Sequence, residues 1–532
     1  MNDNDLILAN LIRRRAGTEP DLDVLTFVDV ARDGGLNEEI RTYRQLWQNG
    51  QRIAAALKAL GMKAGDTFAV VMDNHPEFVD LMVASSILGT IFVPIDPRTR
   101  GEKLRYMLDF AECKGVVVAD GALDEVRTVW TTDSGHWIVP LKGAADARDP
   151  GATLRNVLSA ALPVPPIEVE SVDPEATMQI LYTSGTTGDP KAILTSHAKF
   201  ATGGAIGNVL GLTRADRPYT GLSLTHANAQ VITLGMALTL GMRGVISRKF
   251  TKSRLWDITR RYGCTMFNLL GGMTTAIYAE PRKRDDRDNP VRMVLSAGMP
   301  AAIWEDFARR FDVTINEFYG AAEGGLTFNV ANAGPVGSCG KAPPNLALAI
   351  LNEAGERCAP GEAGEICFRN ADGSAPLVRY LKNPEASARK TAGGWLRMGD
   401  IGHLDPNGWL FFDYRMGGGI RRNGDFINTA FVEKALAELD AVADVYVYGV
   451  PMPGMAPGEK EVVAAIVATD PASFDAQAIF AACRTKLDAN CVPRFLQLVD
   501  EIPKTASEKP QERFLLAAFD VAAPNIHSAS AQ

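Results

Sequence analysis

The chain has 532 residues, which is too long for one ordinary hydrophobic core and predicts two or more domains. Hydrophobic residues make up 46% of it and charged residues 22%, and this globular composition excludes disorder over most of the length. The formal net charge of −8, without a strong basic block, argues against a nucleic-acid-binding protein but not against a nucleotide site built from backbone amides.

The sequence contains no signal for export or membrane insertion. Residues 1–17 lack a basic region followed by an apolar stretch and a cleavage site, and no apolar run reaches membrane-spanning length. The seven cysteines are odd in number and include no CxxC pair, which fits free thiols in a reducing compartment. We therefore expect a cytoplasmic protein without a membrane span.

Helix and strand patterns alternate through the first half of the chain. Apolar residues at helical spacing are followed by short apolar runs that are typical of buried strands. The first of these elements are helices at 44–60 and 77–89 and strands at 68–73 and 90–96. The alternation returns over 254–274 and 291–315, which predicts layered α/β subdomains.

The later part of the chain has a different pattern. From about residue 334, short strands alternate with Gly, Pro and Asn turns and predict a β-rich subdomain. Three glycines at 417–419 form a backbone that can act as a hinge. The helix and strand patterns beyond them predict a separate α+β domain. The expected fold class is therefore α/β, with a large N-terminal domain of layered subdomains and a small mobile C-terminal domain.

The most specific motif is LYTSGTTGDPK at residues 181–191, which follows an apolar run. Glycines let a backbone approach a polyphosphate, hydroxyls and amides donate hydrogen bonds, and the lysine supplies positive charge. It is not a Walker A loop, because Lys191 lies three residues after Gly188 and is followed by Ala192. A polar turn between two strands is the alternative interpretation.

This motif resembles the signature loop of the acyl-adenylate-forming superfamily, which includes acyl-CoA synthetases. Further motifs resemble the family in order over nearly the whole chain. The resemblance implies an ATP-binding loop that consists of Thr183, Ser184, Gly185, Thr186, Thr187, Gly188 and Lys191, with Thr183 also in a catalytic role.

Two segments resemble the acyl and adenine pockets of that family. They are SLTH at 223–226 and SAGMP at 296–300, although a buried histidine and a tight strand-to-helix turn are the alternatives. The resemblance places Ala297 and Gly298 beside the nucleotide. It places His226, Gly271, Gly272, Gly320 and Gly325 around the acyl pocket.

YGAAE at 319–323 resembles the family's Tyr-Gly-x-Thr-Glu motif. It implies nucleotide contacts from Tyr319, Gly320, Ala321 and Ala322 and a magnesium ligand at Glu323, which we also expect to be catalytic. Ala322 replaces a threonine that usually bonds the α-phosphate, so one donor is lost. WLRMGDI at 395–401 resembles the ribose-binding segment, with Asp400 as acceptor of both hydroxyls. Arg415 matches the arginine that also contacts the ribose.

The C-terminal motifs match the family less closely. Gly418 occupies the pivot position of the hinge, and Gly424 matches the loop that acts in thioester formation. PKTASEK at 503–509 resembles the string that ends in the adenylation lysine, here Lys509. Glu508 takes the place of a glycine. The resemblance implies an N-terminal adenylation domain at 1–413, a hinge at 414–419 and a mobile domain at 420–532.

The resulting prediction is an AMP-forming acid–thiol ligase. It uses ATP and Mg²⁺ to convert a carboxylic acid into an acyl-adenylate, then transfers the acyl group to coenzyme A. One alternative is a stand-alone adenylating enzyme that loads a separate carrier protein. The other rivals are a catalytically degraded binder of nucleotide or acyl-adenylate, motivated by Ala322, Gly418 and Glu508, and an ADP-forming ligase or kinase of unrelated fold.

Overall fold

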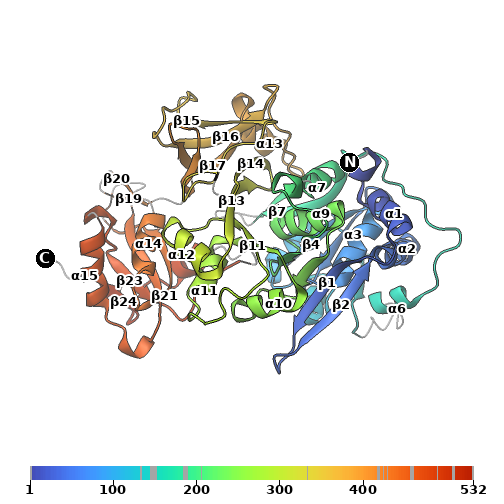
Figure 1. Cartoon of the computed structure of the whole chain (residues 1–532), viewed down its shortest axis with the longest axis horizontal. Helices are drawn as coiled ribbons and strands as arrows, with labels where there is room; N and C mark the ends of the chain where they lie inside the picture. Colours follow the sequence, from blue (N-terminus) through green and yellow to red (C-terminus); the bar gives the residue numbers. More distant parts are fainter. Residues whose placement is uncertain are drawn as a thin grey trace.

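A computed structural model gives the arrangement of the chain (Figure 1). It describes residues 3–131, 135–143, 153–183, 190–204, 206–331, 333–415, 420–422, 425–427, 429–453, 455, 460–487, 489–505 and 510–529. Two large sheets and a smaller antiparallel sheet form the N-terminal domain, and a further sheet forms the core of the small C-terminal domain. The predicted α/β fold class is confirmed.

The first sheet has six strands in the order β6-β5-β3-β4-β7-β8. Their bounds are β3 (Thr67–Val71), β4 (Ile91–Ile95), β5 (Gly115–Val118), β6 (Trp137–Pro140), β7 (Thr177–Thr183) and β8 (Lys191–Ser196). All neighbours are parallel except β7 and β8, which are antiparallel. The two predicted strands at 68–73 and 90–96 are confirmed as β3 and β4.

The second sheet has eight strands in the order β14-β13-β12-β11-β9-β10-β1-β2. Their bounds are β1 (Asp23–Val30), β2 (Leu36–Thr42), β9 (Pro218–Thr220), β10 (Gly244–Ser247), β11 (Met266–Leu270), β12 (Met293–Ala297), β13 (Thr314–Ala321) and β14 (Gly324–Asn329). The strands β11, β12 and β13 are parallel, so their carboxyl ends meet at one edge. The segments predicted to bind nucleotide and acid follow these ends, as is usual in open α/β sheets.

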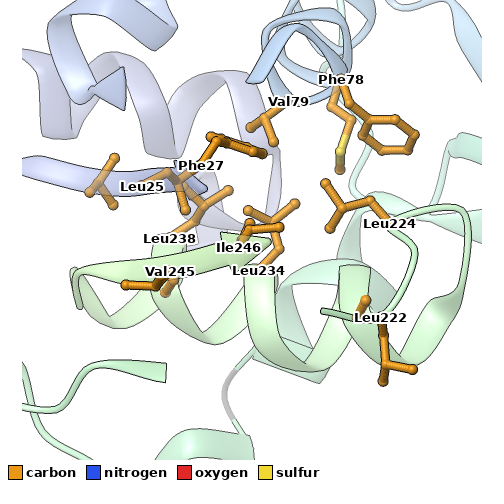
Figure 2. Packing of buried hydrophobic residues seen from close by; sticks show 14 of the residues in the cluster. Leu25, Phe27, Phe78, Val79, Leu222, Leu224, Leu234, Leu238, Val245 and Ile246 are labelled. Carbon is orange, nitrogen blue, oxygen red and sulfur yellow. The ribbon is translucent and has the colours of Figure 1, made fainter. Parts of the chain in front are cut away.

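Helices cover the sheets and fill the space between them. All thirteen residues of α3 are buried, including the charged Asp80, which pairs with Arg41, so other elements enclose this helix on every face. Figure 2 shows side chains of β1, α3, β10 and the helix before β10 meeting in one cluster. The helices are α1 (Leu8–Thr18), α2 (Tyr43–Ala59), α3 (Pro76–Leu88), α4 (Gly101–Phe110), α5 (Leu123–Val129), α6 (Leu154–Ser159), α7 (His197–Gly204), α8 (Ile206–Val209), α9 (Gly235–Leu240), α10 (Leu255–Tyr262), α11 (Gly271–Tyr278) and α12 (Ala301–Phe311). The predicted helices at 44–60 and 77–89 correspond to α2 and α3.

The predicted β-rich subdomain is an antiparallel sheet in the order β15-β16-β17-β18. Its strands are β15 (Leu346–Leu351), β16 (Gly364–Asn370), β17 (Leu396–Leu404) and β18 (Leu410–Arg415), and the helix α13 (Pro384–Lys390) precedes β17. Its buried residues form one cluster with Ile193 of β8 and with Tyr319 of β13. This packing brings β17 close to the end of β13.

The C-terminal domain has a sheet in the order β21-β22-β23-β24 and hydrophobic clusters of its own. Its elements are β21 (Val442–Val450), β22 (Glu461–Ala468), β23 (Phe495–Leu498), β24 (Ile526–Ser528), α14 (Thr429–Ala437), α15 (Ala476–Lys486) and α16 (Glu512–Ala517), after the short pair β19 (Ile420–Arg422) and β20 (Asp425–Ile427). Figure 1 shows this domain at the end of the molecule opposite α1 and α2. Among the helices in the described ranges, none combines the length and the apolar character that a membrane crossing needs.

Candidate active site

The ends of the predicted phosphate loop lie on the hairpin of β7 and β8. Thr183 and Lys191 are cross-strand partners, and the Thr183 hydroxyl donates to the Lys191 carbonyl at 3.4 Å. The Lys191 ammonium lies over the ring of Tyr380, 5.6 Å from its centroid. The hairpin therefore holds both ends of the loop side by side. Residues 184–188 of the prediction lie outside the described part of the chain.

The most complete part of the site joins β13 to β17 and β18. The Tyr319 hydroxyl donates to Asp400 Oδ2 at 2.6 Å, and Arg415 Nε lies 3.2 Å from Asp400 Oδ1. Asp400 is 8% exposed, and burial together with the Asp400 carboxylate raises the pKa of the Tyr319 hydroxyl well above its usual range. The phenol therefore stays protonated and donating. Tyr319 and Arg415, which lie almost a hundred residues apart in the sequence, therefore converge on the Asp400 carboxylate.

Glu323 lies in the tight turn between β13 and β14. Its Oε1 accepts a hydrogen bond from the Tyr380 hydroxyl at 2.8 Å. The Lys199 ammonium, on α7, donates to the carbonyls of Ala322 at 2.6 Å and Glu323 at 3.0 Å. Burial lowers the pKa of Lys199, and the charge of Glu323 opposes that shift. The backbone of the turn is thus fixed by a cation from another subdomain.

The donor set around Glu323 suits a magnesium ion that is shared with a phosphate. Among the described residues, no group of three or more His, Cys, Asp or Glu side chains is placed to hold a metal by itself. Magnesium is commonly bound by one or two carboxylates together with substrate phosphates. Glu323 Oε1 is bonded to a neutral phenol, and the carboxylate stays a hard oxygen ligand. The residues present therefore fit a magnesium ion that arrives with ATP.

The loop after β12 is held by a buried carboxylate that the sequence analysis did not single out. Glu317 on β13 is 2% exposed and accepts hydrogen bonds from the backbone amides of Gly298 and Met299. Burial raises the pKa of Glu317 to about 8, although these two amides lower it. Gly298 has φ of 101°, and a side chain on Gly271 would lie 2.4 Å from the Gly298 carbonyl. Gly271 and Gly298, which were both predicted to lie at the site, therefore allow the segments after β11 and β12 to approach closely.

The segment before His226 is fixed by Asn74, which follows β3 of the six-stranded sheet. The Asn74 amide donates to the carbonyls of Leu222 and Ser247 at 2.8 Å each and accepts from the Leu224 amide at 2.8 Å. After His226, which is partly exposed, residues Asn228–Leu234 form a π-helix that continues into α9. Such wide turns are often found at functional sites.

The remaining glycines of the predicted acyl pocket have different surroundings. Gly320 lies opposite Leu326 in the β13–β14 hairpin, where a side chain would lie 2.7 Å from the Gly325 carbonyl. A side chain on Gly325 would point at Phe368 and at Met398. Gly272 is exposed in the first turn of α11. Their role around an acyl group stays a prediction.

Three predicted residues of the hinge and the C-terminal domain, Gly418, Gly424 and Lys509, lie outside the described ranges. Close to Lys509, Lys504 and Pro510 form an isolated antiparallel bridge. The Lys504 ammonium also pairs with Asp444 Oδ2 at 2.6 Å. The flanks of this segment are therefore held together on the C-terminal domain.

Lys199, Tyr380 and Glu317 belong to the site but were missed by sequence reasoning. The sequence pattern could have identified Glu317, because a carboxylate inside an otherwise buried strand needs a specific partner. No sequence pattern distinguishes Lys199 or Tyr380, since each is a single polar residue in a segment without a motif. Their contribution depends on contacts across subdomains.

Comparison with known proteins assigns the chain to a family. The model of the AMP-binding enzyme family matches residues 12–375, and that of the AMP-binding enzyme C-terminal domain matches residues 432–509. The medium/long-chain-fatty-acid–CoA ligase FadD17 of Mycobacterium marinum is 30% identical over 480 residues, with 88% of this chain and 90% of that protein covered. Long-chain fatty acid transport protein 1 of Homo sapiens is 29% identical over 518 residues, with 91% and 79% covered.

Solved structures share the fold. The anthranilate CoA ligase AuaEII in complex with anthranoyl-AMP superposes with a TM-score of 0.81 at 22% identity, with 96% of each chain covered. The o-succinylbenzoate CoA synthetase MenE of Bacillus subtilis, with its acyl-adenylate intermediate, gives a TM-score of 0.79 at 23% identity, with 95% of this chain and 97% of that chain covered. The chain therefore belongs to the AMP-binding enzyme family, in the acyl-CoA synthetase branch of the acyl-adenylate-forming superfamily.

Proposed function

We propose that this protein uses ATP to activate a carboxylic acid as an acyl-adenylate and then transfers the acyl group to coenzyme A. The observation that carries the proposal is the convergence of Tyr319 and Arg415 on the Asp400 carboxylate, beside the Glu323 turn. A buried, oriented carboxylate suits the two hydroxyls of a ribose. The nearby hairpin of β7 and β8 suits its phosphates.

Each group has a task in nucleotide binding. Asp400 accepts hydrogen bonds from the ribose hydroxyls, while Tyr319 and Arg415 orient it. Lys191 and the loop 183–188 bind the phosphates through charge and backbone amides. Glu323 would hold a magnesium ion, which offsets the negative charge of the departing pyrophosphate. Ala297, Gly298, Gly320, Ala321 and Ala322 line the nucleotide site.

The first half-reaction is a displacement at the α-phosphorus. An oxygen of the acid carboxylate forms a bond to that phosphorus, the bond to the β-phosphate oxygen breaks, and pyrophosphate leaves with the electron pair. Most of the rate acceleration comes from holding the two reactants together and from stabilising the charge of the transition state. We assign to Lys509 the contact with the acid oxygen and the α-phosphate.

The second half-reaction transfers the acyl group to a thiol. The sulfur of coenzyme A attacks the acyl carbonyl carbon, the bond to the phosphate oxygen breaks, and AMP leaves. We propose that the domain at 420–532 rotates about the hinge at 414–419, with Gly418 as pivot. This motion withdraws Lys509 and brings Gly424 to the adenylate.

For the acid, we propose a fatty acid of medium or long chain. FadD17 and long-chain fatty acid transport protein 1 carry such acids in their names and match most of this chain. We assign the acyl pocket to His226, Gly271, Gly272, Gly320 and Gly325, where glycines leave room for a long or bulky group.

The test is acid-dependent exchange of labelled pyrophosphate into ATP, without coenzyme A. The panel contains straight-chain acids from hexanoate to palmitate together with benzoate and anthranilate. Exchange with the straight-chain acids supports adenylation and the choice of acid, and exchange only with the aromatic acids overturns the choice of acid. A folded protein that binds ATP but exchanges with no acid would favour a degraded binder.

The acceptor is tested separately. Adding coenzyme A to an active acid should release AMP and form the acyl-CoA thioester in equal amounts. The FadD17 relative is named as a CoA ligase, which supports this choice over a carrier protein. Adenylate that accumulates with coenzyme A present would favour a carrier protein, and release of ADP would exclude adenylation.

A further inference from the structure

A lysine without an assigned role lies against the ribose-binding strand. Lys390 is the last residue of α13, and its ammonium donates to the Met398 carbonyl at 3.1 Å. Met398 is two residues before Asp400 on β17. The helix therefore delivers this cation to the strand that presents the proposed ribose-binding carboxylate.

Four charged groups of the proposed nucleotide site act on Lys390. Burial lowers its pKa, the carboxylates of Glu323 and Asp400 raise it, and the cations Lys191 and Arg415 lower it again. Lys390 thus lies within electrostatic reach of residues from β8, from the turn after β13, from β17 and from β18.

The two carboxylates near Lys390 already have partners. Asp400 is bonded to Tyr319 and Arg415, and Glu323 is bonded to Tyr380. Across the ranges that the structure describes, Lys390 forms no ion pair of its own. Glu323 and Asp400 act on this partly buried ammonium without forming an ion pair with it, so a ligand that brings negative charge into direct contact would stabilise it further. The Lys390 ammonium is therefore available to pair with an anionic ligand.

We propose that Lys390 is a further nucleotide-binding residue whose ammonium contacts the phosphates of ATP. This inference rests on the proposed function, because it needs ATP in this site. Ala322 cannot supply the hydroxyl donor that the family's threonine gives to the α-phosphate. Lys390, on which the neighbouring Glu323 acts electrostatically, supplies a charged donor, and charge-assisted bonds to phosphate are stronger than neutral ones.

A structural role for Lys390 makes a different prediction. If the ammonium served only to join α13 to β17 through the Met398 carbonyl, its loss would disturb the strand that carries Asp400. Binding of the ribose would then suffer whether or not phosphates were attached. Adenosine, which has the ribose and no phosphate, separates the two roles.

The experiment measures ATP and adenosine affinity by calorimetry on the full chain, in Lys390→Met, Lys390→Arg and Arg389→Met. Arg389 is the exposed neighbour on α13 and pairs with Glu385, so it is a matched control for losing one cation from this helix. Thermal unfolding confirms that each variant is folded. We expect Lys390→Met to lose about ten- to hundredfold in ATP affinity, with adenosine affinity unchanged.

The remaining arms decide between the interpretations. Lys390→Arg should retain most of the ATP affinity, and Arg389→Met should match the original protein. Equal losses for ATP and adenosine in Lys390→Met, or no loss at all, would overturn the inference while leaving the proposed function intact. If the unsubstituted protein binds no ATP, both the proposed function and this inference are refuted.

Discussion

Replacing Lys199 by methionine should change how the protein depends on magnesium. The Lys199 ammonium donates to the carbonyls of Ala322 and Glu323 at 2.6 and 3.0 Å, and these bonds join α7 to the Glu323 turn. Methionine keeps the apolar stem and removes the charge and both donors. The turn then loses these two backbone bonds, and Glu323, which keeps its bond from Tyr380, is positioned less firmly relative to the phosphates.

The size of the effect follows from these two bonds. A hydrogen bond to a charged group contributes about 1.5–3 kcal/mol to stability. Removing the buried ammonium also removes its desolvation cost, which offsets part of that loss. We expect a net destabilisation of about 1–3 kcal/mol, and a displacement of the carboxylate by about 1 Å can lower a rate about a hundredfold.

The assay is pyrophosphate exchange over a range of magnesium concentrations. Lys199→Met should need more magnesium for half of its maximal rate, because the carboxylate that would hold the ion is no longer positioned. A variant that is only less stable would show a lower rate with the same half-saturating magnesium. Lys382→Met is the control, since this exposed lysine pairs with Glu112 away from the turn. An unchanged half-saturating concentration in Lys199→Met would refute the positioning role.

Three further predictions test other parts of the site. Tyr319→Phe removes the 2.6 Å bond to Asp400 and should weaken ATP binding about tenfold, measured as KM in exchange; an unchanged KM would mean that Asp400 is oriented without the phenol. The pKa of Glu317 is raised from 4.5 to about 8, so its stabilising contribution is complete below about pH 4.5 and is lost as the pH rises through about 8. Glutamine is neutral throughout, so the melting temperature of Glu317→Gln relative to the original protein should rise over this window, and a constant difference would contradict the assignment. Gly272→Leu should exclude long acids from exchange and spare short ones, whereas a full acid profile would remove Gly272 from the pocket lining.

The elements with strong periodicity were predictable because their pattern is local. The α2 helix buries one face and begins with a capping box at Thr42 and Gln45, and α3 begins with a proline and consists mostly of apolar residues. Both could be identified from neighbouring residues alone. The π-helix Asn228–Leu234 could not, since its sequence reads as an ordinary apolar helix.

The site was predictable only as far as its motifs are contiguous. YGAAE is contiguous, so Tyr319 on β13 and Glu323 in the turn after it could be named together, but their partners lie elsewhere in the chain. Tyr380 is 57 residues from Glu323, and Lys199 is 123 residues from Ala322. Such contacts depend on how the subdomains pack, and no spacing in the sequence encodes them.

The loss of the family's threonine at Ala322 gives the last prediction. If Lys390 serves the same phosphate as the missing hydroxyl, restoring it should not simply add to the affinity for ATP. Ala322→Thr alone should change ATP affinity little, because Lys390 already contacts the phosphates. The same change in Lys390→Met should recover part of the loss, since the hydroxyl then has no competitor. Residues that share a partner show such non-additivity, whereas independent ones add.

A double-mutant cycle with calorimetry on the four proteins measures this coupling, with Ala322→Ser as a second donor. Strict additivity would mean that the hydroxyl and the ammonium act on different groups, and Lys390 would then not explain how the site tolerates Ala322. A coupling energy well above the usual error of about 0.5 kcal/mol would mean that a cation has replaced a hydroxyl at one phosphate. In that case the departure at position 322 is a substitution within a working nucleotide site. It would no longer argue for a degraded binder.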